Sequence, residues 1–288
     1  MTQQENRNLN TLIVGVGLIG GSFALSLREH GYTGRIVGVE ASADHARRAV
    51  ELGLVDEVVS LEEGVAVADL VVLATPVDTL PQLAVKVLNH VGPHQTVIDV
   101  GSTKEELCEM ISHHTNRGRF VATHPMWGTE YSGPEAAQRE AFVGRNVVVC
   151  EEDRSDRDAL ALVEQIYADF GMPIVRMGAE EHDLHTAYVS HISHITSFAL
   201  ALTVLEKERE EQHIFDLAGG GFESTVRLAK SSARTWVPIL MRNKYNVLDV
   251  LREHIHQLQV MRKQIERDDV EGLAESIGKA NSIQRIIK

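Results

Sequence analysis

Two short segments hold the side chains best suited to proton transfer. They are Asp-Val-Gly-Ser-Thr-Lys at 99–104 and His-Pro-Met-Trp-Gly-Thr-Glu at 124–130, and each follows an apolar run. A neutral histidine can take the proton of a hydroxyl while hydride leaves the same carbon, and a nearby serine hydroxyl can fix its tautomer. We therefore predict that His124 is a general base beside Ser102. The alternatives are a turn histidine and a helix N-cap; a serine hydrolase is disfavoured because no Gly-x-Ser-x-Gly elbow occurs.

Four histidines form two His-x-x-His pairs further along the chain, at 182/185 and 191/194. A spacing of three places His191 and His194 on one face of a helix. A metal site is an alternative, but no carboxylate stands at a matching offset within 188–205. Because this uncharged segment is rich in serine and threonine, we predict that His191 and His194 face a ligand and that no metal is bound.

A basic stripe follows the glycine triplet at 219–221, which is predicted to end one helix and start another. Arg227, Lys230 and Arg234 recur at helical spacing in an otherwise acidic protein. A guanidinium binds a carboxylate through two parallel hydrogen bonds. Arg227 therefore predicts a substrate that bears a carboxylate; a solvated helix face is the alternative.

A glycine turn near the N-terminus is the strongest local motif. A strand-like run leads into Gly-x-Gly-x-x-Gly, formed by Gly15, Gly17, Leu18, Ile19 and Gly20. Such a turn lets the backbone approach a pyrophosphate, which then faces the N-terminus of the next helix. A second strand ends at Glu40, where an acid accepts hydrogen bonds from ribose hydroxyls and repels a 2′-phosphate. The pattern predicts a dinucleotide site that prefers NAD to NADP. Thr75 and Pro76 end the next strand and either border this site or form an ordinary turn.

The chain changes character near residue 178. Before it, apolar β-rich runs alternate with amphipathic helical segments, as in a Rossmann-type doubly wound parallel sheet; the runs are 11–16, 35–39, 70–74, 96–100, 119–122, 146–150 and 173–177. After it, helical periodicity dominates, with apolar stripes at 187–205 and 247–267. We predict a dinucleotide-binding domain over 1–178 and an all-helical dimerisation domain over 179–288, whose stripes share a core with a second copy.

Composition narrows the possible partners. The 288 residues include 28 Lys and Arg against 41 Asp and Glu, a net charge of −13, which disfavours nucleic acid and anionic membrane surfaces. Cys108 and Cys150 belong to no motif and fit a reducing cytoplasm. Two uncharged stretches, 8–27 and 186–205, resemble membrane segments in their lack of charge. The first, however, contains glycines, and the second contains histidines. We therefore interpret both as interior elements of a soluble protein.

Together these segments resemble the prephenate/arogenate dehydrogenase family of tyrosine biosynthesis. The matching pieces are Gly-Val-Gly-Leu-Ile-Gly-Gly-Ser at 15–22, the segments at 99–104 and 124–130, Ser-His-Ile-Ser-His at 190–194 and Gly-Phe-Glu-Ser-Thr-Val-Arg at 221–227, with Trp236 and Asn243 downstream. They run in family order over nearly the whole chain. The chain departs from the pattern at 190–194, where many members have Ser-His-Leu-Pro-His, and at Ser224, where an acid is frequent.

The resemblance implies an active site between an NAD-binding domain and a helical domain, and a homodimer formed through the latter. It implies oxidative decarboxylation of prephenate to 4-hydroxyphenylpyruvate, CO2 and NADH. His124 would draw off the ring hydroxyl proton, Ser102 would orient His124 and touch the nicotinamide, and Arg227 would hold a carboxylate. The other implied substrate-pocket residues are His191, His194, Glu130, Thr129, Ser224 and Trp236.

Other functions remain open at this stage. Arogenate is the alternative substrate, although neutral Ser224 favours prephenate, because arogenate carries an ammonium that an acid would match. A β-hydroxyacid-type dehydrogenase usually does its proton work with a lysine, and 188–205 contains none. A regulator with an inactive site would bind NAD without turnover.

Overall fold

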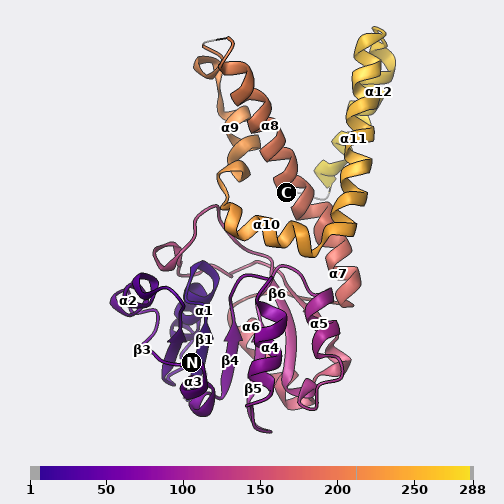
Figure 1. Cartoon of the computed structure of the whole chain (residues 1–288). Coiled ribbons are helices and arrows are strands. Elements are labelled where there is room, and N and C mark those ends of the chain that lie inside the picture. Colours follow the sequence, from indigo (N-terminus) through magenta and orange to yellow (C-terminus); the bar gives the residue numbers. More distant parts are fainter. Residues whose placement is uncertain (1–6, 212, 286–288) are drawn as a thin grey trace, which may run out of the picture.

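The computed structural model describes residues 7–211 and 213–285. It shows a sheet with helices on both faces, from which two helical arms extend (Figure 1). One sheet contains all eight strands, in the order β3-β2-β1-β4-β5-β6-β7-β8. The strands are β1 Thr11–Val14, β2 Ile36–Val39, β3 Glu57–Val58, β4 Leu70–Leu73, β5 Thr96–Asp99, β6 Phe120–Pro125, β7 Val147–Cys150 and β8 Ile174–Met177. Every predicted run overlaps a strand, although β6 extends to Pro125, beyond the run 119–122; the two-residue β3 was not predicted.

The sheet is mostly parallel, with one exception. The six neighbouring strands from β3 through β2, β1, β4 and β5 to β6 all pair in parallel. Strand β7 pairs with β6 in the antiparallel sense, and β8 runs parallel to β7. The predicted parallel, doubly wound sheet is confirmed, with β6–β7 as its antiparallel pair. A parallel pair needs a crossover, usually a helix, whereas the chain between β6 and β7 forms only the short 3₁₀ turn Pro134–Ala136.

Two hydrophobic cores lie on opposite faces of the sheet, because successive strand residues point to opposite sides. Ile13 packs into the core shared with α1 and α6, whereas its neighbours Leu12 and Val14 pack with α3, α4 and α5. The helices of this domain are α1 Leu18–Glu29, α2 Ala43–Glu51, α3 Leu61–Val67, α4 Leu80–Leu88, α5 Glu105–Ile111 and α6 Arg157–Asp169. The two cores make the sheet a rigid support for the loops at its carboxyl edge.

Helices make up the described chain after β8. They are α7 Ala179–Thr186, a π-helical turn Ala187–His191, α8 Ile192–Glu208, α9 Gly220–Val226, α10 Ala233–Arg242, α11 Lys244–Glu266 and α12 Val270–Ala280. Helix α7 packs against α5 of the sheet domain. Helices α8 and α9 form one arm, α11 and α12 form the other, and α10 lies between the arms and the sheet (Figure 1).

The arms carry large apolar side chains that the single chain leaves exposed. Leu202 and Leu205 of α8 are 66% and 52% exposed, and Leu258 and Ile265 of α11 are 53% and 64% exposed. The stretch 186–205 is therefore not an interior element of one chain, which corrects the prediction. The apolar stripe is present, but the described chain has no second layer to cover it.

Candidate active site

The glycine turn between β1 and α1 lies at the carboxyl edge of the sheet. Gly15 has a φ of +94°, and a Cβ atom there would lie 2.6 Å from the carbonyl oxygen of Ala74, so the close approach of the turn to β4 requires glycine. A Cβ atom on Gly17 would meet nothing within 4 Å. Gly17 is the N-cap of α1 and has no side chain that could cap the helix, and the first turn of α1 has no acid. The first N–H groups of α1 are thus available to an anion.

Glu40 lies next to this turn, at the end of β2. Its two carboxylate oxygens accept hydrogen bonds from the backbone N–H groups of Val16 and Ser42, each at 3.1 Å. The carboxylate is therefore held beside the glycine turn. This is the placement that the sequence predicts for an acid that binds the ribose.

Residues after three neighbouring strands complete the same edge. Thr75 and Pro76 follow β4, Ser102 follows β5, and His124 lies near the end of β6. In the strand register, Leu73 of β4 is beside Asp99 of β5. The carboxyl ends of parallel strands border the ligand crevice of such sheets, so the predicted cofactor and catalytic residues lie along one edge.

His124 has the protonation state of a base. The residue as a whole is partly exposed. Burial lowers the pKa of His124 well below its usual value, and the neighbouring His182, Lys104 and His191 lower it further. The imidazole is therefore neutral at physiological pH and able to accept a proton.

A chain of hydrogen bonds leads from His124 into the helical domain. The Nδ1 atom of His124 lies 2.8 Å from Nε2 of His182, and Nδ1 of His182 lies 2.7 Å from Oδ1 of Asp183. His182 and Asp183 belong to α7 and are 0% and 2% exposed. The general-base candidate of one domain is thus connected to a buried carboxylate of the other.

The Asp183 carboxylate is fixed by the backbone at the start of α5. Its Oδ1 accepts from the N–H of Lys104 at 2.8 Å, and its Oδ2 accepts from the N–H of Glu105 at 3.0 Å. The Lys104 ammonium is itself fully buried and forms an ion pair with the equally buried Asp99. These contacts join the loop after β5 to α7 and fix the interface between the domains beside His124.

Ser102 does not make the contact predicted for it. Both residues are described, and no hydrogen bond joins Ser102 to His124; His182 occupies Nδ1 of His124 instead. Ser102 also caps no helix, because α5 begins at Glu105 and Lys104 is its N-cap residue. Ser102 is partly exposed on the loop after β5, so contact with the nicotinamide stays a prediction.

His191 and His194 both contact one aromatic side chain. The ring of His194 stacks on Trp236 with centroids 3.3 Å apart, and the ring of His191 meets Trp236 edge-on at 6.0 Å. The Nδ2 atom of Asn243 lies 3.1 Å from Nδ1 of His191. His191 ends the π-helical turn Ala187–His191, a feature often found at functional sites.

These two histidines are also neutral at physiological pH. Burial lowers the pKa of His191 to about 4 and places the pKa of His194 below its usual value. They can therefore act as hydrogen-bond donors or acceptors, but carry no charge for a carboxylate. No group of three histidine, cysteine or acidic side chains suited to a metal occurs within 7–211 and 213–285.

Arg227 of the helical domain contacts the segment after β6. Its Nη1 atom lies 3.1 Å from Oε2 of Glu130, and the two side chains are 51% and 16% exposed. Ser224 is exposed on α9, and its hydroxyl donates to a carbonyl within that helix at 3.0 Å. Thr129 accepts a backbone N–H from its own loop at 3.3 Å. The structure thus brings Glu130 to Arg227, while Ser224 and Thr129 make only local bonds.

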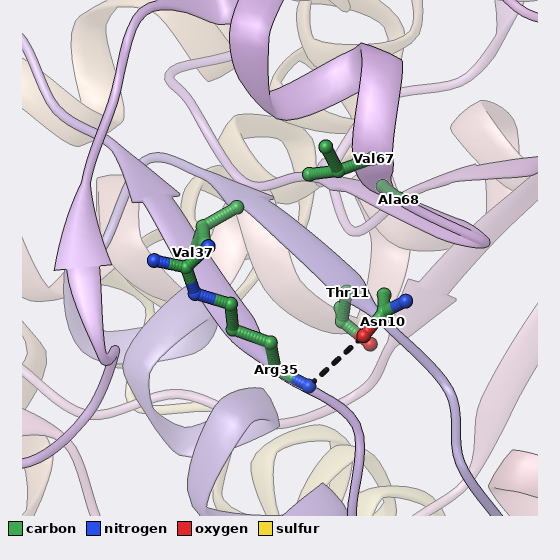
Figure 2. A pocket seen from close by; sticks show the side chains of 6 residues that line it. All are labelled: Asn10, Thr11, Arg35, Val37, Val67 and Ala68. Atoms are coloured by element: carbon green, nitrogen blue, oxygen red, sulfur yellow. Dashed lines mark hydrogen bonds between the residues drawn. The ribbon is translucent and has the colours of Figure 1, made fainter.

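A small cavity lies at the opposite edge of the sheet. Figure 2 shows it between the starts of β1 and β2 and the end of α3, with a volume of about 180 Å³, lined by Asn10, Thr11, Arg35, Val37, Val67 and Ala68. The backbone N–H of Arg35 donates to the Asn10 side chain at 3.1 Å. Because Thr11 begins β1 and Arg35 precedes β2, this cavity is at the amino ends of the strands. It therefore belongs to neither His124 nor the glycine turn.

Comparison with known proteins agrees with this arrangement. Residues 23–176 match the family model described as the nucleotide-binding domain of prephenate dehydrogenase, and residues 178–279 match its dimerization domain. The chain belongs to the prephenate dehydrogenase family. The resemblance stated from the sequence motifs is thereby confirmed, as is the order of a Rossmann-like domain before a helical one.

Individual relatives of the prephenate dehydrogenase family cover almost the whole chain. Prephenate dehydrogenase of Bacillus subtilis is 34% identical over 91% of this chain and 71% of its own. The structure of prephenate dehydrogenase from Aquifex aeolicus with hydroxyphenyl propionate and NAD+ has a TM-score of 0.87 and 33% identity, covering 97% of this chain and 98% of that one. Arogenate dehydrogenase of Synechocystis has a TM-score of 0.75 at 25% identity, covering 97% of this chain and 100% of that one.

The sequence did not predict where His182 and Asp183 lie. The His-x-x-His spacing pairs His182 with His185, yet His182 is buried at the domain interface and His185 is exposed. The available signal was the adjacent His-Asp pair in the first helical segment after the last strand of the sheet domain. Two polar residues at that junction are close to the carboxyl edge only if α7 packs against α5, which the local sequence does not show.

Proposed function

We propose that this chain catalyses the NAD-dependent oxidative decarboxylation of prephenate to 4-hydroxyphenylpyruvate. The observation that carries the proposal is the neutral imidazole of His124, a partly exposed residue on the same sheet edge as the uncapped glycine turn. Oxidation at a carbon that bears a hydroxyl needs a base for the O–H proton and a place for the hydride acceptor. The family match supports prephenate as the substrate.

The proposed reaction requires one base and accurate positioning. The glycine turn and Glu40 would hold NAD, which would supply the acceptor for the hydride of the ring carbon that carries the hydroxyl. His124 takes the hydroxyl proton as a carbon–oxygen double bond forms. When the ring carboxylate leaves as CO2, its bonding pair makes the ring aromatic, and His124 returns the proton to the phenolate oxygen. Because aromatisation drives the step, the protein supplies mainly orientation and a neutral base.

The residues of the sheet edge fit a dinucleotide. The N–H groups at the start of α1 would bind the pyrophosphate, and Glu40 would accept the ribose hydroxyls. The set that we propose for cofactor binding is Gly15, Gly17, Leu18, Ile19, Gly20, Glu40, Thr75, Pro76 and Ser102. Each follows a strand at the carboxyl edge or starts α1.

The Glu40 carboxylate should make the enzyme selective for NAD. We expect wild-type kcat/KM to favour NAD over NADP by about 100-fold, because a 2′-phosphate would meet a fixed carboxylate, and like charges in contact cost several kcal/mol. Glu40→Ser should reduce that ratio by roughly tenfold. Asp44→Ser, which removes an exposed acid of α2 paired with Arg47, is the matched control and should leave the ratio unchanged. Equal wild-type kcat/KM for both cofactors would refute the assignment of Glu40.

The substrate preference depends on charge near Arg227. Prephenate has a keto group where arogenate has an ammonium, so an unmatched acid in the pocket would favour arogenate. Ser224 is neutral, and the nearby Glu130 already pairs with Arg227. These contacts support prephenate; the similarity to Synechocystis arogenate dehydrogenase makes arogenate the second candidate.

A single substitution tests this preference. Wild type should have the higher kcat/KM for prephenate, and Ser224→Asp should move the ratio toward arogenate by roughly tenfold, since a new carboxylate would attract the ammonium. Glu223→Gln is the control for the other acid of α9 and should leave the ratio as it is. A wild-type preference for arogenate would contradict the assignment of prephenate.

We further propose a homodimer formed through the helical domain, which we assign to 179–288 after a dinucleotide domain at 1–178. The exposed apolar faces of α8 and α11 support a second copy as the partner, as does the match to a dimerization domain. The helical stretch Ala179–Glu208 is long and apolar enough to cross a membrane by length and composition. However, it buries His182, Asp183 and His191 inside the protein, so we infer protein contact in the cytoplasm instead of a bilayer.

The proposed activity is tested by mixing the protein with NAD and prephenate and recording absorbance at 340 nm. Steady formation of NADH supports the dehydrogenase. Binding of NAD without turnover on either prephenate or arogenate would indicate the nucleotide-sensing regulator instead.

A further inference from the structure

We propose that Asp183 and His182 are positioning residues that set the tautomer of His124, so that its Nε2 atom carries the free electron pair. The inference rests on the proposed role of His124 as the base. Both positioning residues are buried side chains of α7: His182 contacts Nδ1 of His124, and Asp183 contacts the far nitrogen of His182. The inference assigns the helical domain a part in proton transfer.

The Asp183 carboxylate determines the direction of the hydrogen bonds that join it to His182 and His124. The Asp183 oxygens already accept two backbone N–H groups, and an ionised carboxylate is an acceptor only. His182 must therefore donate to it from Nδ1, which leaves its Nε2 as an acceptor. His124 must then donate from Nδ1, which leaves its Nε2 without a proton. A neutral histidine in the opposite tautomer would present an N–H to the substrate hydroxyl and could not accept its proton.

The contacts of α7 leave the hydrogen bonds between Asp183, His182 and His124 little freedom to rearrange. The backbone carbonyl of Asp183 accepts from the Asn243 side chain at 2.6 Å, while its carboxylate is held at the start of α5. The rings of His124 and His182 have their centroids 5.0 Å apart at 67°. Both side chains behind His124 are buried, so water does not compete for their hydrogen bonds.

The same series of hydrogen bonds compensates the positive charge that His124 acquires during the reaction. When His124 accepts the proton it becomes cationic among Lys104, His182 and His191, all of which disfavour that charge. The buried Asp99 is already paired with Lys104. Asp183 is the carboxylate that reaches His124, through His182, and so it stabilises the transient imidazolium.

A purely structural role for Asp183 is the competing explanation, because its carboxylate also satisfies the N–H groups at the start of α5. The Asp183→Asn variant distinguishes this structural role from the proposed control of the His124 tautomer. An asparagine keeps an oxygen for a backbone N–H but can donate its amide N–H to His182, which would reverse every hydrogen bond and place the His124 proton on Nε2. Loss of capping alone would lower stability without changing the tautomer.

We expect Asp183→Asn to lower kcat for prephenate by about 10–10³-fold while KM for prephenate and NAD stays within about twofold. The acidic limb of the kcat–pH profile should move to lower pH, because the carboxylate favours the protonated imidazole. Nitrogen-15 NMR of the histidine rings, with His124 assigned from its own Asn variant, should show the proton on Nδ1 in wild type and on Nε2 in Asp183→Asn.

A second pair of variants covers the case in which Asp183→Asn does not fold. His182→Gln can place its carbonyl oxygen near the former Nε2 and still accept from Nδ1 of His124, whereas His182→Leu of similar volume cannot. The glutamine variant should keep at least about tenfold more kcat than the leucine variant. Equal kcat in the two variants, or a wild-type His124 protonated on Nε2, would overturn the proposal. A wild type without turnover on prephenate would instead overturn the proposed function, and the NMR result would still decide the tautomer.

Discussion

His124→Asn should lower kcat by about 10²–10⁴-fold with little change in KM for prephenate. Asparagine keeps a polar side chain of similar length to the ring but has no basic nitrogen, so the hydroxyl proton has no acceptor. Binding is hardly affected, because the lost interaction develops only as the proton moves. Steady-state kinetics at 340 nm with purified variants measures both constants.

The pH dependence of the wild type is part of the same expectation. Since burial lowers the pKa of His124 well below its usual value, kcat should be constant around neutral pH and fall only at distinctly acidic pH, as the imidazole becomes protonated. His90→Asn alters an exposed histidine at the end of α4, whose ring contacts the Lys86 carbonyl, and should leave kcat unchanged. A His124→Asn variant that retained most of its activity would exclude His124 as the base.

Arg227→Ala should raise KM for prephenate by about 10–30-fold while kcat changes much less. A hydrogen bond to a charged group contributes about 1.5–3 kcal/mol, and the half-exposed position of Arg227 places the expected effect in the lower part of that range. Removing the guanidinium also leaves Glu130 without its partner, so a carboxylate substrate would meet an uncompensated negative charge. Initial rates over a range of prephenate concentrations check this.

Arg157→Ala is the matched control for this loss of charge. Arg157 is an exposed arginine that begins α6, at the opposite edge of the sheet, where the preceding Asp156 bonds the backbone before β6. Its removal should leave KM within about twofold. An unchanged KM in Arg227→Ala would show that another group binds the substrate carboxylate.

The features that the sequence predicts well are those determined by residues close to one another in the sequence. The turn after β1 needs a positive φ at Gly15 and open space at Gly17, and the Gly-x-Gly-x-x-Gly spacing reports both conditions directly. Glu40 closes the next strand, so its place beside the turn follows from parallel pairing of β1 with β2. The strand runs likewise predict the order of a sheet domain before a helical one.

The parts that the sequence does not predict depend on contacts between distant segments. His124 and His182 are 58 residues apart, and their contact requires α7 to pack on α5 across the domain boundary. The N-cap alternative for Ser102 is wrong for a local reason: α5 starts at Glu105, later than the polar run indicates, so the serine stays on the loop. The exposure of α8 is not predicted for a third reason. An apolar stripe in the sequence does not reveal whether the residues that cover it belong to the same chain or to a second copy.

The measurement that tests the central claim most directly is the stoichiometry of the reaction. The protein would be incubated with limiting prephenate and excess NAD, and NADH, released CO2 and 4-hydroxyphenylpyruvate would be quantified at completion. The proposed mechanism predicts one of each per prephenate consumed, because hydride transfer and loss of the ring carboxylate are parts of one aromatisation. NADH formed without an equal amount of CO2, or consumption of prephenate without NADH, would contradict it.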